Sequence, residues 1–323
     1  MNKWKGPVFL FLAFSLAGTS VISARLVSGR LGLFTIAATS LLLACLFLFP
    51  VCGKRLLETL RLLSARDILY LGFQAVFGIF LFRIFLLNGL LLTSAVEAGI
   101  LTGATPAITA VLALALLREP VSAKALAGII ATVTGIMVLQ GLLTSIGGIF
   151  SLKHLYGNLL VLCAAASESA FNVISRAFAA KAGTNKKQAI PPLVQTALVS
   201  AIAFFLCLIP ALFEAPVQKL GEIGLKGWIA LLWYGFFVTA LAFLFWYSGI
   251  KECGALTAAA FSGMMPFTAM VLSVIVLGEH ASWQQWLGGM LVLSGMLLIG
   301  AAKTPAGTKN PAGVMDRAPD TNL

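Results

Sequence analysis

Residues 103–135, with the sequence GATPAITAVLALALLREPVSAKALAGIIATVTG, recur as residues 263–295, with the sequence GMMPFTAMVLSVIVLGEHASWQQWLGGMLVLSG. The two copies align without a gap, and each encodes two apolar helices joined by a turn. An internal repeat in a chain this apolar indicates a transporter, because many transporters assemble a central site from two related halves. The identical residues include Gly103, Pro106, Leu117, Glu119, Ser122, Gly128 and Gly135, which recur as Gly263, Pro266, Leu277, Glu279, Ser282, Gly288 and Gly295.

The composition of the whole chain is that of an integral membrane protein. Hydrophobic residues make up 60% of the sequence, charged residues 10%, and the mean hydropathy is +1.00. In soluble domains about a quarter of the residues carry charge. Membrane-spanning strands are not expected, because the apolar runs are continuous rather than alternating.

The apolar runs predict ten membrane-spanning helices, since each run is close to the ~20 residues that an α-helix needs to cross the bilayer core. The predicted fold class is an all-α polytopic membrane protein with two inverted five-helix repeats around a central cavity. The repeats cover residues 1–143 and 155–302, with a connecting loop at 144–154 and a disordered tail at 303–323. The expected helices are 7–24, 32–50, 68–91, 95–117 and 124–143 in the first repeat, and 155–177, 192–212, 227–248, 255–277 and 283–301 in the second.

The first helix has the features of a signal peptide, because Lys3 and Lys5 precede an apolar run. We expect it to be retained. The run is long enough to span, and its segment at 21–23, Val-Ile-Ser, recurs at 173–175 in the sixth helix. The segment therefore opens the first repeat, and its removal would leave the two repeats unmatched.

The net charge of +11 follows the side of the membrane and does not indicate nucleic-acid binding. With the N-terminus inside, sixteen Lys and Arg residues fall in cytoplasmic segments and five on the opposite side, while Arg83 lies within a span. The positive-inside rule therefore places both termini in the cytoplasm. Because five spans is an odd number, the second repeat must enter the membrane in the opposite orientation.

Motifs for catalysis or cofactor binding are absent from the sequence. The five cysteines are scattered, and the two histidines, His154 and His280, lie near loops, so neither pattern is that of a metal or redox site. There is no HExxH, GxSxG, Walker A or GxGxxG pattern. We expect neither enzymatic activity nor a cofactor.

The segments at 94–106, 117–120, 255–266 and 277–279 resemble the EamA family of the drug/metabolite transporter superfamily. In that family an Ala-rich helix opening is followed by a Pro, then by a Leu-x-Glu ending and a Gly-containing final helix. The resemblance covers residues 7 to 301. It implies ten helices in two inverted repeats, a central cavity, and export of small metabolites or amino acids from a bacterial inner membrane.

The repeated prolines and glycines have separate physical interpretations. Pro106 and Pro266 lack an N–H group and are expected to kink the fourth and ninth helices, so both are hinge candidates, although membrane helices also tolerate proline without any hinge. The paired glycines at 128 and 135, and at 288 and 295, lie seven residues apart on one helix face and favour close packing. Glu119 and Glu279 end apolar helices, where a structural role is expected, through hydration or pairing with cations of the loops.

Three charges lie inside predicted spans and are the main candidates for a substrate or coupling site. These are Arg83, Glu97 and Glu168, and each costs about 2.5–3.5 kcal/mol to insert before pairing. With the α-helical rise of about 1.5 Å per residue, their depths form a column, so Arg83 is expected to reach either carboxylate. Asn172 lies four residues after Glu168 on the same helix face. The alternative is a structural ion pair that only holds the helices together.

The eighth predicted helix is rich in aromatic residues, most of which suit an interfacial belt. Phe243 is the counterpart of Arg83 in the second repeat. A cavity-facing Arg83 therefore predicts a cavity-facing Phe243. A charged wall opposite an aromatic wall suits a small amphipathic metabolite, such as an amino acid, or an organic cation.

Taken together, the sequence favours a secondary transporter that exports a small metabolite by alternating access. Its expected partners are the small-molecule substrate, the lipid bilayer and protons. Glu168 is expected to be a coupling or substrate-amine site, Arg83 to hold Glu168 or a substrate carboxylate, and Glu97 to be the outer gate. Two alternatives stay open at the level of sequence: an exchanger of phosphorylated or nucleotide-linked solutes, and a membrane scaffold that does not transport. Substrate identity and oligomeric state are not specified by these residues.

Overall fold

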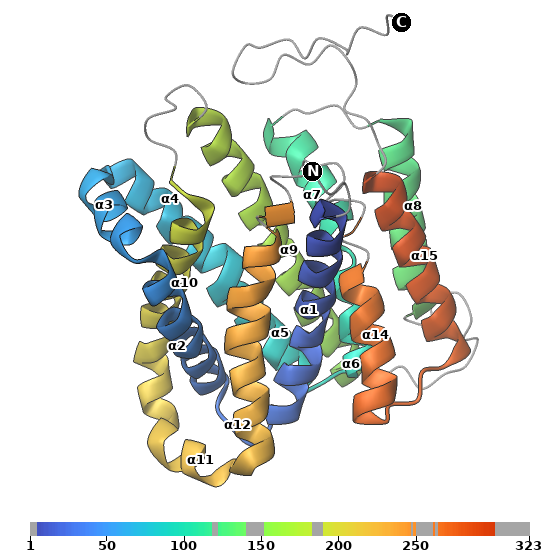
Figure 1. The fold of residues 1–323 in the computed structure, drawn as a ribbon. Coiled ribbons are helices and arrows are strands. Elements are labelled where there is room, and N and C mark those ends of the chain that lie inside the picture. The colour runs from blue at the N-terminus through green and yellow to red at the C-terminus, as the bar shows by residue number, and fades with distance from the viewer. Residues whose placement is uncertain are drawn as a thin grey trace, which may run out of the picture.

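The computed structural model of the protein describes residues 5–117, 122–139, 152–182, 190–246, 248–249, 261 and 264–300. Within these residues every regular element is a helix, apart from one isolated β-bridge between Ser28 and Leu31. The helices stand side by side as a bundle (Figure 1). They are α1 Lys5–Val27, α2 Leu33–Cys52, α3 Lys54–Leu62, α4 Ala65–Ala75, η1 Val76–Leu81, α5 Phe82–Leu90, α6 Ala95–Thr102, α7 Thr105–Leu117, α8 Ala123–Leu139, α9 Leu152–Ala182, α10 Pro192–Ala211, η2 Leu212–Glu214, α11 Pro216–Glu222, α12 Gly224–Leu232, η3 Trp233–Leu241, α14 Met264–Leu277 and α15 Trp283–Gly300.

Seven helical stretches are long and apolar enough to cross a membrane, so this is a multi-pass integral membrane protein. They are Lys5–Val27, Leu33–Cys52, Ala65–Leu90, Ala95–Leu112, Leu152–Ile174, Leu193–Glu214 and Gly224–Trp246. Three shorter apolar helices, Ala123–Val138, Met264–Leu277 and Trp283–Ile299, lie where the sequence predicts the fifth, ninth and tenth spans. The all-helical class is confirmed, and the complete set of ten inverted spans stays a prediction.

The structure also departs from the expected helix boundaries. The fourth predicted helix is divided at residues 103–104 into α6 and α7, and the sixth extends over 152–182. The short helix α3 is not among the predicted spans, because its nine residues include Lys54, Arg55, Glu58 and Arg61 and are too few and too polar to cross a membrane. None of its residues is buried. Glu119, residues 255–260 and the tail from 303 lie outside the described residues.

Helices α8 and α15 lie side by side at one edge of the bundle (Figure 1). Glycines allow them to pack closely. A Cβ atom on Gly128 would lie 2.6 Å from the carbonyl oxygen of Gly295, and one on Gly135 would lie 2.7 Å from that of Gly288. The predicted packing role of these four residues is therefore confirmed. The first glycine of one copy faces the last glycine of the other, so the two helices run antiparallel.

Two segments of π-helix interrupt the third and eighth spans at matching places. They are η1, which ends at Leu81, and η3, which ends at Leu241, and these two ends are equivalent positions of the repeat. Widened π turns are rare and frequent at functional sites. Fully buried side chains such as Leu86, Leu101 and Met270 form the core beside them.

Candidate functional site

Arg83 is a buried cation at the junction of α5, α2 and η3. Only 5% of the residue is exposed. Its Nη1 atom donates to the carbonyl oxygen of Ala37 at 3.3 Å and to Oγ of Ser40 at 2.5 Å, both on α2. Its Nη2 atom donates to Oγ1 of Thr239 at 2.8 Å, and its guanidinium carbon lies 4.5 Å from the centre of the Tyr234 ring. Arg83 therefore joins helices from the two halves of the sequence.

The two hydroxyl groups that accept from Arg83 are themselves fixed by backbone carbonyls. Ser40 Oγ donates to the carbonyl of Ile36 at 2.8 Å, and Thr239 Oγ1 donates to that of Tyr234 at 2.9 Å. Because each hydroxyl hydrogen is used in this way, the oxygen lone pairs stay free for the guanidinium group. The Thr239 bond reaches back five residues, which is the separation characteristic of a π turn.

The expected pairing of Arg83 with Glu97 or Glu168 is wrong. Among the described residues no carboxylate lies within ion-pair distance of Arg83, and the one charged contact joins Glu97 to His154. Depth along a span is a poor guide because it does not say which face of the helix a side chain occupies. Arg83 turns toward α2 and η3, whereas both glutamates lie in the seam where α6 and α7 pack against α9.

Glu97, on α6, is surrounded by donors at one end of this seam. Its Oε2 atom lies 2.8 Å from Nε2 of His154 and accepts from Nδ2 of Asn158 at 2.7 Å. Its Oε1 atom accepts from Nε2 of Gln285 at 3.0 Å. The hydroxyl of Thr93 contacts both Glu97 and Asn158. The carboxylate thus ties α6 to α9 and α15.

Sequence reasoning misses three of these partners. His154 gives no sign of a site because it lies near a loop, and the sequence singles out neither Asn158 nor Gln285. One signal is available: His154 and Asn158 are four residues apart and therefore share a face of one helix. Gln285 offers no such signal, because it contacts Glu97 only through the packing of distant helices.

Glu168 lies further along α9, beside the break in the fourth span. Its Oε2 atom accepts from Oγ1 of Thr105 at 2.9 Å, and the neighbouring Ser169 donates to the carbonyl of Thr105, also at 2.9 Å. Thr105 is the first residue of α7. Glu168 therefore meets the amino end of a half-helix, where the helix dipole favours negative charge. Sequence reasoning misses Thr105, although it directly precedes Pro106.

The sequence predicts two other residues for this site, Asn172 and Phe243. Asn172 is half-buried one turn beyond Glu168, and no hydrogen bond joins the two side chains among the described residues. Phe243 is half-buried, and its ring lies edge-on to Trp246 with 6.3 Å between ring centres. This ring contact of Phe243 is made within its own span.

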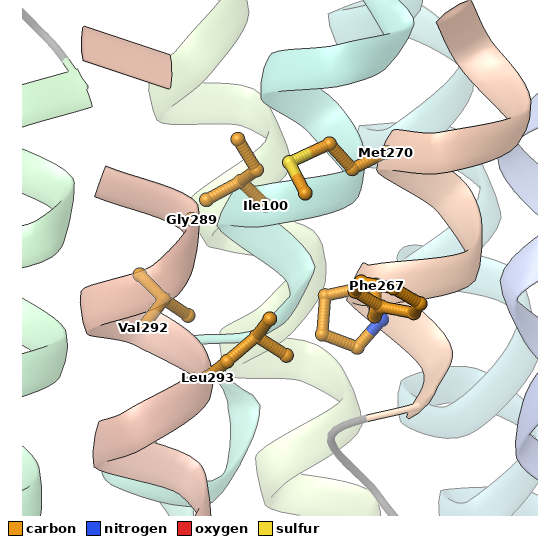
Figure 2. Close-up of a pocket in the computed structure, with 7 residues that line it drawn as sticks. Ile100, Phe267, Met270, Gly289, Val292 and Leu293 are labelled. Atoms are coloured by element: carbon orange, nitrogen blue, oxygen red, sulfur yellow. The ribbon is translucent and has the colours of Figure 1, made fainter. Parts of the chain in front are cut away.

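The two candidate hinge prolines lie in the first turns of α7 and α14 as the structure describes them. The chain leaves the helical path at residues 103–104, just before Pro106, since proline is tolerated in a first turn and not in a helix interior. Pro266 lines a small apolar crevice between α6, α14 and α15. Figure 2 shows the side chains of Ile100, Phe267 and Met270 facing this space.

Two further glutamates cap helix ends. Glu279 accepts from the backbone N–H groups of Ala95 and Val96 at 3.1 and 2.9 Å, at the start of α6. Glu214 accepts in the same way from Phe34 and Thr35 at the start of α2. The expected structural role of Glu279 is confirmed, but through a helix cap and not through hydration or cations of the loops. Caps of this kind satisfy orphan N–H groups that the first helical turn leaves.

No group of three or more His, Cys, Asp or Glu side chains in the described part of the chain is arranged to hold a metal ion. Arg83 has no carboxylate partner in the described part of the chain, and the two carboxylates, Glu97 and Glu168, have very different surroundings. Such a set can bind a small charged solute and can exchange protons.

Comparison with known proteins shows similarity to transporters along nearly the whole chain. The EamA-like transporter family matches residues 4–140 and again residues 155–301. Two uncharacterized transporters of Bacillus subtilis strain 168 are similar: YetK is 31% identical over 290 residues, or 89% of this chain and 84% of YetK, and YyaM is 28% identical over 288 residues, or 88% of each chain. A solved crystal structure of another protein, 21% identical, has the same fold with a TM-score of 0.59 over 91% of this chain and 95% of its own.

Proposed function

Because the chain belongs to the EamA-like transporter family, we propose that it is a secondary transporter that exports a small amphipathic metabolite, such as an amino acid, by alternating access. The observation that carries this proposal is the contact of Glu168 with Thr105. It places a carboxylate inside a span, at the amino end of a half-helix. Discontinuous helices with charged groups at their ends are the usual sites of substrate and coupling ions in secondary transporters.

The proposed architecture is ten spans in two inverted repeats, 1–143 and 155–302, with both termini in the cytoplasm of a bacterial cell. The crossed glycine contacts between α8 and α15 support it, as they pair equivalent positions in reverse order. The matching ends of η1 and η3 support it as well. In Figure 1, α1 begins and α15 ends at the same end of the bundle, and α11 lies at the opposite end.

In this proposal the Glu97 cluster closes the outer end of the pathway. Glu97 joins the fourth span to α9 and α15, which belong to the other half of the sequence. Opening toward the outside therefore requires these hydrogen bonds to break. Pro106 and Pro266 act as hinges. Arg83, Asn172 and Phe243 line the path of the solute.

Proton coupling is assigned to Glu168. Thr105 is the one hydrogen-bond donor to its carboxylate among the described residues, so protonation breaks no network. A carboxylate that exchanges a proton between the two access states couples solute movement to the proton gradient. No described group of residues suggests that energy is supplied in another way.

The test is flux in proteoliposomes with an imposed proton gradient, using a panel of amino acids, amines, purines and sugar phosphates. The variant Glu168→Gln keeps an oxygen that accepts from Thr105 but cannot ionise. We expect transport of the solute to persist while its dependence on the gradient falls at least about tenfold, corresponding to about 1.4 kcal/mol. The matched control, Glu58→Gln, alters an exposed carboxylate on α3.

Two outcomes would contradict parts of this proposal separately. Unchanged coupling in Glu168→Gln would remove Glu168 from the mechanism. Absence of flux for every member of the panel would argue against transport itself and favour a membrane scaffold.

A further inference from the structure

Arg83 has no negative charge to neutralise it within the part of the chain that the structure describes. The carboxylates of the described spans have partners elsewhere. Glu97 contacts His154 and two amides, and Glu168 accepts from Thr105. Asp67 and Glu214 cap the starts of helices. Glu279 is held by a helix end. A buried cation among neutral oxygens is costly, because hydroxyl and carbonyl dipoles replace only part of the hydration that it has lost.

Arg83 and Tyr234 have hydrogen-bond donors without acceptors among the described residues. Three hydrogen bonds use three of the five N–H groups of Arg83, so two have no acceptor among the described residues. The hydroxyl of Tyr234, whose ring stacks under the guanidinium group, is buried and also has no partner there. Tyr234 as a whole is 2% exposed. An anion with two acceptor oxygens would satisfy this set.

The second half of the molecule lacks the matching cation. Ser200 is the repeat counterpart of Ser40, and its hydroxyl is buried without a partner among the described residues. The counterpart of Arg83 is Phe243. Of these two equivalent positions, therefore, only the one in the first half carries a cation, and the one in the second half carries an aromatic residue.

From these observations we infer that Arg83 and Tyr234 bind the carboxylate group of the transported solute, which is a small organic acid with one carboxylate and an apolar or aromatic body. This inference rests on the transport function proposed above. A planar guanidinium group matches the two oxygens of a carboxylate. A single cation in a span fits one negative charge and does not fit a phosphate dianion.

The site also lies beside the two π segments. Arg83 follows the π segment η1 by two residues, and Thr239 and Tyr234 lie within the π segment η3. An anion bound there contacts both halves of the sequence at once. Binding of the anion therefore links the two halves, whose relative motion opens and closes the path in the proposed mechanism.

The inference is tested on the full chain, purified in detergent, with pairs of ligands that differ only in charge. The pairs are acetate and acetamide, benzoate and benzamide, and L-leucine and L-leucinamide. Binding is measured as the rise in the midpoint of thermal unfolding and by calorimetry. We expect at least one acid to bind about tenfold or more tightly than its amide. Equal effects of acid and amide in every pair, or no effect of any acid, would overturn the inference.

Tyr234→Phe is the most informative variant, because it removes a hydroxyl that has no described partner in the ligand-free protein. It should melt at the temperature of the wild type or above it, yet bind the acid about tenfold more weakly. Arg83→Lys keeps the charge without the fork and should lose at least about tenfold in affinity. Arg55→Gln, which removes an exposed cation on α3, serves as control and should bind normally. Wild-type affinity in both site variants would assign Arg83 to structure alone.

This experiment separates the inference from the proposed function. Flux of a solute that is unaffected by either site variant would leave the transporter intact and refute the anion site. Charge-dependent binding without flux of that ligand would support the anion site and count against transport.

Discussion

Glu97 and Glu168 lie in the same seam between α9 and the fourth span, yet their surroundings differ sharply. Side-chain donors from His154, Asn158 and Gln285 surround the carboxylate of Glu97. Only Thr105, among the described residues, donates to that of Glu168. The number of donors that face a buried carboxylate distinguishes a group that fixes helices from one that is available for exchange.

The cause of this difference is the way each end of the seam is assembled. Near Glu97 the starts of α6, α9 and α15 come together, and each supplies a polar residue from its first or second turn. Glu168 lies in mid-helix, where most of its neighbours along α9 are apolar or small and Asn172 is the polar exception. Polar side chains are frequent at helix ends and expensive inside spans, so only the first site can be saturated.

The largest effect that this comparison predicts is for Glu97→Ala. The substitution leaves the donors of Asn158 and Gln285 without their acceptor, and we expect it to lower the free energy of unfolding by about 2–4 kcal/mol. Equilibrium unfolding in detergent measures this change. Glu58→Gln is the control and should stay within about 0.5 kcal/mol of the wild type, as expected for surface positions. A stable Glu97→Ala variant would show that the cluster does not hold the helices.

The sequence is sufficient for the helices and insufficient for this cluster, for a physical reason. Apolar length and glycine spacing act along the chain, so the positions of α2, α8, α10 and α15 and the contact of Gly128 with Gly295 are predictable. The partners of Glu97 come together only when α9 and α15 pack against α6. The residue pattern within one helix does not predict contacts between helices that are distant in the sequence.

The contacts of Arg83 are also beyond what the sequence predicts. Its position deep in an apolar run is visible in the sequence, and the structure shows that only 5% of the residue is exposed. Its partners do not follow, because they depend on the rotation of the helix about its axis and on the π turn that presents Thr239. The sequence thus identifies the charged residues and assigns the wrong contacts to Arg83.

A smaller effect is expected for Gln285→Ala, which removes one donor from Glu97. Gln285 also accepts from the backbone of Ser282 at 2.9 Å and so helps to cap α15. Loss of both contacts should lower the free energy of unfolding by about 1–2 kcal/mol. The matched control is Gln284→Ala, in the same helical turn and without these bonds. Equal stabilities of the two variants would mean that the link from α15 to Glu97 contributes nothing.

The smallest effect is predicted in a comparison of two single variants, Glu97→Gln and Glu168→Gln. Glu97→Gln places an amide among donors, where one of its oxygens is replaced by a group that cannot accept, and about 1–2 kcal/mol should be lost. Glu168→Gln keeps an acceptor for Thr105 and faces no other described donor, so its free energy of unfolding should stay within about 0.5 kcal/mol of the wild type. Parallel unfolding of the two variants measures the contrast. A loss at Glu168 as large as that at Glu97 would mean that Glu168 is also a structural anchor, and its assignment to proton exchange would then lose its physical basis.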